Sequence, residues 1–376
     1  MDRFIPLSIP NFEGNEKKYV DDALEQGWVS TGGAYITKLE KNMEEFLHTE
    51  NVAACQSGTA ALHLSLIEAG VKSGDVVIVP PLTFIAAVNP VKYQFAVPVF
   101  LDCDDSFCMD PIKLQNFCEQ ECTYVDNKLL YKGRHVKALV VVHVFGNLAD
   151  MPAIMKIAGR YGIKVIEDAT EALGSRYTEG EYAGKYAGTI GDFGAFSFNG
   201  NKIITGSSGG CFLTNDEEAA NKVRKWSTQA RENAPWYQHA ELGYNYRMSN
   251  VIAGVVRGQF PYLEEHIAQK KAIYERYKKG FEGLPVTMNP FDADNSEPNF
   301  WLSCMIIDPD AMCKQVRGEQ EALYVAEAGK SCPTEILEAI ASINAEGRPI
   351  WKPMHMQPIY RLNPFIVRDG NGRARS

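Results

Sequence analysis

Lys202 is the residue whose surroundings most suggest chemistry. It stands in the segment FSFNGNKIITGSSGG, between two apolar, strand-like stretches and beside a glycine-rich turn. A surface lysine does not need such a frame, whereas a lysine fixed in a tight loop can act in covalent or proton-transfer chemistry. Chance proximity to a Gly-rich loop is the simpler alternative, so the chemical interpretation requires a partner elsewhere in the sequence.

Asp168 is that partner. It lies in VIEDATEALGS, at the carboxyl end of a predicted strand, where open α/β sheets place their ligand crevice. A lysine and a carboxylate together are what pyridoxal phosphate (PLP) requires. The lysine holds the aldehyde, and the carboxylate keeps the pyridine nitrogen protonated so that the ring can draw electrons. Capping of the following helix is the structural alternative for Asp168.

A phosphate site is predicted at Ser57-Gly58-Thr59, between a strand and a helix. Backbone N–H groups and hydroxyls there would face an anion at the positive end of the helix. The tripeptide is common at such junctions and is weak evidence alone. Phe84 follows a strand and a Pro-Pro turn and suits stacking on a pyridine face, although core packing is the simpler explanation of an isolated phenylalanine.

Five segments in order resemble the signature segments of the sugar aminotransferases of PLP fold type I, the DegT/DnrJ/StrS group. They are SGTAALHLSL, EDATEALGS, GDFGAFSFNGNK, GYNYRMSN and WKPMHMQP. The resemblance spans residues 5 to about 365, and an ordered set is more specific than any one segment. It implies an α/β fold: a large domain with a mostly parallel, seven-stranded sheet flanked by helices, and a smaller C-terminal α/β domain.

The resemblance also implies roles for single residues. Lys202 would hold the PLP aldehyde, and Asp168 would pair with the pyridine nitrogen, so both would be catalytic. Glu171 would lie near the phenolic oxygen, where related sequences often have Gln. The remaining implied cofactor contacts are Gly58, Thr59 and Ser197 with the phosphate, Phe84 with the ring, and Asn245 with the phosphate of the neighbouring subunit. The implied active unit is a homodimer with shared active sites.

Substrate residues are implied near both ends of the chain, where two segments resemble the lining of the sugar-nucleotide entrance. They are Trp28, Thr31, Gly32, Trp351, Lys352 and His355. The resemblance also implies that Arg247 stabilises the segment through which Asn245 reaches the neighbouring subunit. A structural salt bridge is the alternative for Arg247. His143 resembles a position beside the cofactor, but a histidine that ends a buried strand is more often a satisfied core residue.

The closest resemblance is to enzymes acting on UDP- or GDP-linked 4-keto-6-deoxy N-acetyl hexosamines, as in bacillosamine or legionaminic acid routes, with perosamine-type synthases as near neighbours. It implies an aminotransferase that uses L-glutamate to aminate a nucleotide-linked 4-keto-6-deoxy sugar for surface polysaccharide. The alternatives are a PLP-dependent sugar dehydratase, whose relatives carry histidine at the lysine position, and a PLP- or sugar-binding protein without turnover. A Rossmann dehydrogenase is disfavoured because QSGTAALHL lacks G-x-G-x-x-G. The nucleotide, the sugar configuration, the pathway and any assembly above the dimer stay open.

Composition excludes other classes. The 376 residues are 45% hydrophobic and 23% charged with a formal net charge of -9, which is ordinary globular usage and repels nucleic-acid phosphates. No signal-like or membrane-spanning apolar run is present, so a cytoplasmic protein with no membrane or nucleic-acid partner is predicted. Four cysteines lie close together in the sequence and could suggest a zinc site. Their spacing differs from the paired cysteines of the usual zinc knuckles, so no metal is predicted. These are Cys103, Cys108, Cys118 and Cys122.

Strand and helix patterns alternate from residue 51 to about 226, as in a mostly parallel sheet covered on both faces. Helical spacing over residues 250–282 predicts one long helix or two, kinked at Pro261. Residues 118–134 show no period and are predicted to be a surface excursion, and residues 231–240 a loop reaching out of its own subunit. The predicted strands are 52–55, 76–79, 97–101, 138–144, 164–166, 195–198 and 210–214.

Two domains are expected for a chain of this length. Residues 1–250 would form the large PLP-binding domain, with residues 1–50 partly at the substrate entrance, and residues 251–376 the small domain. Family members usually continue beyond the segment NPFIVRDGNGRARS with another strand and a helix. The small domain is therefore expected to be incomplete relative to the family.

Overall fold

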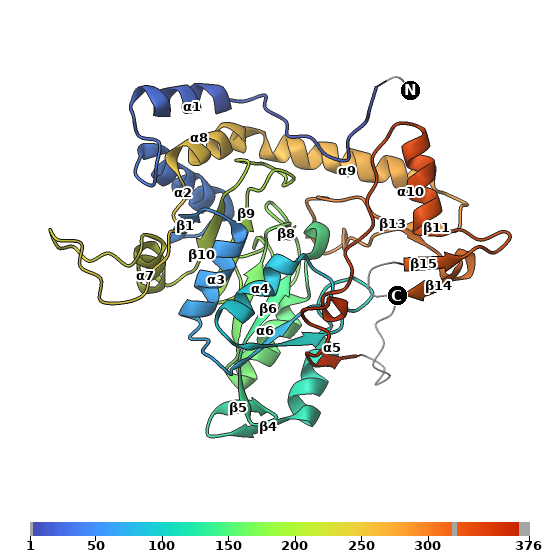
Figure 1. Cartoon of the computed structure of the whole chain (residues 1–376), viewed down its shortest axis with the longest axis horizontal. Coiled ribbons are helices and arrows are strands. Elements are labelled where there is room, and N and C mark those ends of the chain that lie inside the picture. Colours follow the sequence, from blue (N-terminus) through green and yellow to red (C-terminus); the bar gives the residue numbers. More distant parts are fainter. Residues whose placement is uncertain (1–2, 318–321, 368–376) are drawn as a thin grey trace.

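A mixed β-sheet forms the centre of the protein in a computed structural model that describes residues 3–317 and 322–367 (Figure 1). Its main path runs β1-β10-β9-β7-β6-β2-β3-β16, and the hairpin β4–β5 joins it at β6. Neighbouring strands from β9 to β16 are parallel, whereas β1–β10 and β10–β9 are antiparallel. The strands of this sheet are β1 Val52–Cys55, β2 Val76–Val79, β3 Val97–Leu101, β4 Cys122–Val125, β5 Lys128–Tyr131, β6 Arg134–Val142, β7 Lys164–Asp168, β9 Phe193–Ser197, β10 Gly210–Leu213 and β16 Phe365–Ile366.

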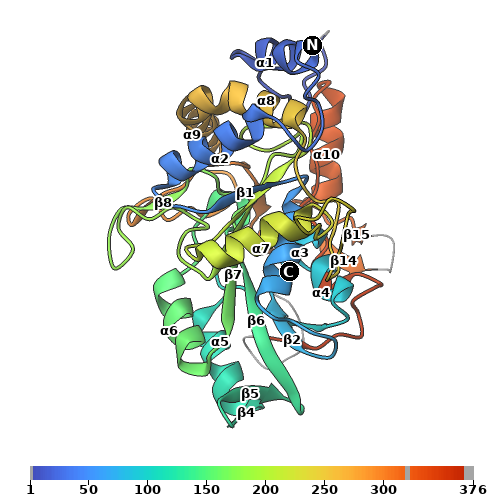
Figure 2. The same cartoon turned by 90° about the vertical axis from the view of Figure 1, so that its left-hand side faces the viewer.

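Helices flank the sheet, so the α/β class predicted from the sequence is confirmed. Figure 2 shows α3 and α6 on opposite sides of β6 and β7. None of the helices within the described ranges has the length and apolar character that a bilayer crossing requires. The helices are α1 Glu16–Glu25, α2 Ala34–Leu47, α3 Gly58–Glu68, α4 Asn89–Tyr93, α5 Pro111–Asn116, α6 Met151–Tyr161, α7 Glu217–Ser227, α8 Asn250–Gln259, α9 Leu263–Gly280 and α10 Pro333–Ser342.

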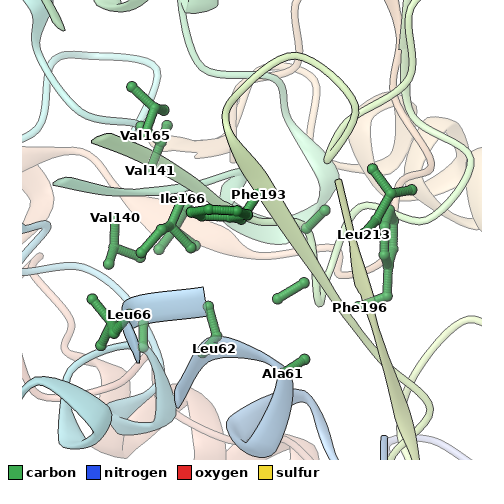
Figure 3. Close-up of a cluster of buried hydrophobic side chains, with 14 of the residues drawn as sticks. Ala61, Leu62, Leu66, Val140, Val141, Val165, Ile166, Phe193, Phe196 and Leu213 are labelled. Carbon is green, nitrogen blue, oxygen red and sulfur yellow. The ribbon is translucent and has the colours of Figure 1, made fainter. Parts of the chain in front are cut away.

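The core lies between α3 and the sheet. Leu62 and Leu66 of α3 turn toward Val140, Ile166 and Phe193 of the central strands (Figure 3), and all five side chains are buried. Strand β6 is covered on both faces, which explains the continuous apolar run at its end. This packing fixes the helix that begins beside the carboxyl ends of the strands.

The sheet is larger than the seven strands expected. All seven predicted strands are present, and β4, β5 and β16 are added. The first two form a hairpin in the stretch predicted to be a surface excursion, which corrects that prediction. Asp126 and Asn127 at its tip both have positive φ, 50° and 58°, as tight hairpin turns require. Leu129 and Tyr131 of β5 are buried, so the hairpin is part of the fold.

The helical region after residue 250 agrees with the prediction of two helices kinked at Pro261. That proline lies in a 3₁₀ turn, Phe260–Tyr262, between α8 and α9, because its ring cannot continue an α-helix. Helix α8 packs against α1 and α2 from the amino-terminal part of the chain. The fold places one end of this helical region beside the residues predicted at the substrate entrance.

The remaining chain forms small paired strands and α10, on the right of Figure 1. The pairs are β11 Val286–Met288 with β13 Met305–Ile307, β12 Ser296–Glu297 with β8 Arg176–Tyr177, and β14 Lys314–Arg317 with β15 Ala322–Val325. Because β12 pairs with β8, and β16 with β3, the chain after residue 250 twice returns to the first part. The boundary at 250 stays a prediction, and residues 368–376 of the predicted tail lie outside the described residues.

Candidate active site

Asp168 is the last residue of β7, between β6 and β9 at the carboxyl ends of parallel strands. Its side chain is buried, and Oδ1 accepts the Thr170 N–H at 3.1 Å. Burial raises the pKa of this carboxyl, opposed by the hydrogen bonds from Thr170 and by the charge of Lys202. Burial thus disfavours the ionised carboxylate, and a positively charged group beside it would stabilise that form.

Lys202 lies in the loop between β9 and β10, where its N–H donates to the Asn199 carbonyl at 3.0 Å. Its ammonium lies 4.2 Å from the centre of the Trp301 ring. The residue as a whole keeps some exposure, but burial of the amine lowers its pKa, while Glu171 and Asp168 act in the opposite direction. A lysine with a lowered pKa is more easily neutral, which nucleophilic and base chemistry both require.

Glu171 is the second buried carboxyl beside this lysine. Burial raises its pKa to about 7, opposed by the charge of Lys202 and by the Phe145 N–H, which donates to Oε2 at 2.8 Å. Phe145 has a φ of 58° inside the turn after β6, an unusual conformation for a bulky residue. The strained turn aims its N–H at Glu171, so the site combines one amine with two carboxyls of raised pKa.

His143 and Glu167 form a buried pair behind Asp168. His143 Nε2 lies 2.9 Å from Glu167 Oε2, and His143 Nδ1 accepts the Ala149 N–H at 3.2 Å. An accepting Nδ1 leaves the proton on Nε2, so the imidazole donates to the carboxylate. Glu167 also accepts backbone N–H groups from the 188–191 turn. Both ring nitrogens of His143 are thus engaged in hydrogen bonds near Asp168, as is typical of a core histidine.

The predicted phosphate site lies at the start of α3. Ser57 caps the helix, because its hydroxyl accepts the Ala60 N–H at 3.0 Å. A Cβ on Gly58 would lie 2.9 Å from Thr170 Cγ2 and 3.0 Å from Ser197 Cβ, so only glycine fits without displacing them. The helix terminus, Ser197 and the stretch after Asp168 are therefore packed together. Free N–H groups at a helix N-terminus favour a phosphate.

Phe84 and Trp351 are also close together, although they lie far apart in the sequence. Phe84 is 54% exposed, and its ring centre lies 6.1 Å from that of Trp351. Trp351 in turn lies 5.4 Å from Phe145, whose N–H binds Glu171. An aromatic wall thus extends from the buried carboxyl to the predicted substrate residue Trp351. The exposed Phe84 ring is available for stacking.

The other residues near the carboxyl end of the chain make local contacts. The His355 ring stacks on Phe365 at 3.8 Å between ring centres and lies 6.4 Å from Phe100. The Lys352 carbonyl accepts a hydrogen bond from the Gln357 side chain at 3.1 Å. These contacts place the segment against β3 and β16 and leave the substrate role of its side chains a prediction.

The amino-terminal candidates Trp28, Thr31 and Gly32 are exposed in the connection between α1 and α2. Asn250 at the start of α8 fixes this connection, because its Nδ2 donates to the Trp28 carbonyl at 2.6 Å and its Oδ1 accepts the Tyr35 N–H at 2.9 Å. The start of α8 therefore holds this connection in place.

Asn245 and Arg247 lie in the segment before α8. Asn245 is exposed and forms an antiparallel bridge with Thr228, so its role toward a neighbouring subunit stays a prediction. Arg247 Nη1 lies 2.6 Å from Glu40 Oε1 and 3.3 Å from the Ala54 carbonyl. That pair corresponds to the structural salt bridge considered as its alternative.

Three residues of the site were missed from the sequence: Glu167, Asn299 and Trp301. Glu167 carried a signal, because a charged residue directly after the buried pair Val165-Ile166 must find buried partners. Asn299 and Trp301 lie in NFWLSC, about 100 residues after Lys202, and no local pattern connects them with it. Within the described ranges, no group of three or more His, Cys, Asp or Glu side chains could hold a metal ion.

The residues present fit PLP. The site offers an amine for the aldehyde, a buried carboxyl for the pyridine nitrogen and a capped helix N-terminus with hydroxyls for the phosphate. The close approach of Gly58 to Thr170 and Ser197 shapes that terminus. This donor set is what the cofactor needs.

Fold and site together define a PLP-dependent aminotransferase of fold type I. The model of the DegT/DnrJ/EryC1/StrS aminotransferase family matches residues 10–366, and the chain belongs to that family. EpsN of Bacillus subtilis (strain 168), which carries the name of a pyridoxal phosphate-dependent aminotransferase, is 37% identical over 99% of this chain and 88% of its own. A GDP-perosamine synthase of Escherichia coli O157:H7 is 33% identical over 95% of this chain and 87% of its own.

A solved structure has the same fold. Helicobacter pylori PseC, an aminotransferase involved in the biosynthesis of pseudoaminic acid, matches 96% of this chain and 88% of its own with a TM-score of 0.80. At 19% identity this similarity concerns the fold alone. It agrees with the fold type expected from the sequence.

Proposed function

We propose that the protein transfers the amino group of L-glutamate to the ketone of a nucleotide-linked 4-keto-6-deoxy sugar, giving the 4-amino sugar. The relatives named GDP-perosamine synthase, at 33% and 32% identity, support a sugar nucleotide as substrate. The product would serve surface polysaccharide, with bacillosamine and legionaminic acid routes as further members of the class. We propose the cytoplasm as the place of the reaction.

The observation that carries the proposal is the largely buried amine of Lys202, whose charge interacts with the two buried carboxyls of Glu171 and Asp168. A dehydratase of this fold would carry histidine at that position, whereas an amino-group transfer needs a base that gives and takes a proton. Burial lowers the pKa of Lys202, which makes the neutral form of the amine easier to reach. The lysine can then act in both half reactions.

PLP, when bound, supplies an aldehyde that takes an amino group from one substrate and gives it to the carbonyl of the next. In this chain Lys202 holds the aldehyde at rest and, once released, moves the proton from the donor α-carbon. Asp168 keeps the ring nitrogen protonated, and the start of α3 with Ser197 binds the phosphate. Glutamate leaves as 2-oxoglutarate, whose keto oxygen comes from water, and the ketone oxygen of the sugar leaves as water, so the exchange balances without an external oxidant.

Phe84 would stack on the ring of the cofactor, and the sugar nucleotide would lie beside it against Trp351, whose ring centre is 6.1 Å from that of Phe84. Such a surface suits a base or a sugar face and excludes water from the reacting carbons. The other candidates for this entrance are Trp28, Thr31, Gly32, Lys352, His355 and, beside the cofactor, His143. Their contributions remain part of the proposal.

The active unit would be a homodimer, with Asn245 binding the phosphate in the neighbouring subunit and Arg247 supporting the crossing. The loop before Asn245 extends away from the body of the chain (Figure 1) and exposes Trp236, Tyr237 and Leu242. Exposed aromatic residues on a projecting loop are typical of an interface. They support the proposal of a second copy at this surface.

Incubation of the purified protein with ¹⁵N-glutamate and a panel of UDP-, GDP- and dTDP-linked keto sugars tests the proposal. The expected product, seen by mass spectrometry, is one sugar nucleotide whose ketone oxygen is replaced by a ¹⁵N amine. Lys202→Ala is the control and should give none. Loss of a sugar hydroxyl without nitrogen uptake would establish the dehydratase instead. Failure of glutamate to convert the cofactor to its amino form would favour the binding protein.

A further inference from the structure

Trp301 contacts the side-chain amine of Lys202. Its ring centre lies 4.2 Å from Lys202 Nζ, and its indole N–H donates to the Asn201 carbonyl at 2.8 Å. One buried side chain thus touches both the amine of Lys202 and the backbone just before it. Within the described ranges, no carboxylate lies within 4.0 Å of the Lys202 amine to form an ion pair.

Asn299 ties Trp301 to the stretch that carries Glu171. Its Nδ2 donates to the carbonyls of Glu171 at 2.9 Å and Leu173 at 3.0 Å, and its N–H donates to Ser175 Oγ at 3.0 Å. Its Oδ1 accepts the Trp301 N–H at 3.0 Å. The buried amide is fully engaged, so the indole is fixed relative to the loop that bears the second carboxyl.

Phe300 provides a second anchor for the indole. It has a φ of 53° and is buried, with its ring centre 4.6 Å from that of Phe291 and 5.2 Å from that of Tyr274. A bulky residue keeps a left-handed backbone only where its surroundings enforce it. Phe300 and Trp301 therefore pack in separate places, which leaves the Trp301 ring against the lysine.

The nature of this contact matters for a lysine that must both carry and lose a proton. An ammonium is attracted to the face of an indole, but less strongly than to a carboxylate in a buried ion pair. An aromatic face therefore positions the amine without locking it in its charged form. Glu171 and Asp168 act on the amine from a longer distance and are the other titratable groups that face it.

We propose that Trp301 is a positioning residue for the aminotransferase reaction. Its ring face holds the amine of Lys202 whenever that amine is free, and its N–H fixes the loop from which the lysine extends. Lys202 is thereby kept within reach of the aldehyde instead of turning to solvent. The residue acts through Lys202 and has no chemical step of its own.

Incorporation of 5-fluorotryptophan into the full-length protein tests the contact without changing packing. The five tryptophans give ¹⁹F resonances, and the Trp301 line is the one absent from Trp301→Phe. We expect this line to titrate with the ionisation of Lys202 in cofactor-free protein, to shift on addition of PLP and then to stop titrating. Lys202→Met, which keeps Glu171 and Asp168, should remove the titration. The same titration in that variant, or none in the wild type, would overturn the proposal.

A second measurement follows the capture of added PLP by absorbance, in Trp301→Phe and Trp301→Leu. The Phe variant keeps a ring face, so its rate constant should stay within about threefold of wild type. The Leu variant should be about tenfold slower or more, because the amine is no longer oriented. Thermal melting shows whether each variant is folded. Equal capture rates in folded wild type and Leu variant would exclude the positioning role, and a Leu variant that fails to fold leaves the ¹⁹F titration as the deciding result.

Discussion

Glu171→Gln should make the cofactor-free protein more stable at pH 8 and leave its stability nearly unchanged at pH 5. Folding raises the pKa of Glu171 from its ordinary 4.5 to about 7, chiefly through burial. At about 1.4 kcal/mol for each pKa unit, the ionised carboxylate costs the folded state about 3 kcal/mol. Glutamine is uncharged and still accepts the Phe145 N–H, so it removes the cost and keeps the contact.

The direction of the effect follows from proton affinity. Because the folded protein binds this proton more tightly than the unfolded chain does, stability falls as pH rises between about 4.5 and 7. The cost is absent below that window and complete above it. With about 2 cal/mol/K of unfolding entropy for each of the 376 residues, 3 kcal/mol corresponds to a melting shift of about 4 °C.

Thermal melting of PLP-stripped protein at pH 5 and pH 8 measures this difference. Stripping matters because a bound cofactor adds its own pH-dependent stabilisation. Glu338→Gln, on an exposed position of α10, is the matched control and should melt like the wild type at both pH values. If Glu171→Gln changes the melting temperature equally at both pH values, or lowers it at pH 8, burial of an ionised Glu171 is refuted as the origin of the effect.

Three further outcomes test the site. Borohydride reduction of the PLP-loaded protein should fix the cofactor to the peptide that contains Lys202, and labelling of another lysine such as Lys185 would contradict this assignment. Asp168→Ala should still bind PLP but slow turnover by orders of magnitude, because the ring nitrogen loses its charge partner; turnover within about threefold of wild type would contradict the role. Mixed Lys202→Ala and Asn245→Asp proteins should recover about half of the wild-type activity per hybrid dimer, because one shared site is then intact. Verified subunit exchange without recovery would mean that Asn245 serves its own subunit.

The central elements could be predicted because their signals are local. The buried run of β6 and the four apolar residues of β2 form strands covered on both faces, and such strands show themselves as continuous apolar stretches. Ser57 caps α3 at the predicted junction of strand and helix, and Pro261 separates α8 from α9. In each case one or two residues determine the outcome within a single turn of chain.

The added strands could not be found in this way, because they depend on distant partners. Strand β16 has two residues, and it exists only because Phe365 and Ile366 pair with Phe100 and Leu101 of β3. The β4–β5 hairpin carried a weak local signal, the Asp126-Asn127 turn between Val125 and Lys128. Four-residue strands with no regular alternation of apolar and polar residues do not differ from loops until β6 is placed beside them.

The same distinction separates the two halves of the candidate site. Lys202 and Asp168 could be identified from the sequence because the local pattern around each residue already predicts its position. Lys202 lies in a tight loop between two strands, and Asp168 lies at the end of a buried strand. Trp301 could not be identified from the sequence, because its importance comes from the 4.2 Å contact with Lys202 and from the hydrogen bonds of Asn299 to residues 171–175. Those contacts join residues that lie about 100 positions or more apart in the sequence. A local pattern can identify the group that reacts, whereas the groups that hold it in place are determined by tertiary packing.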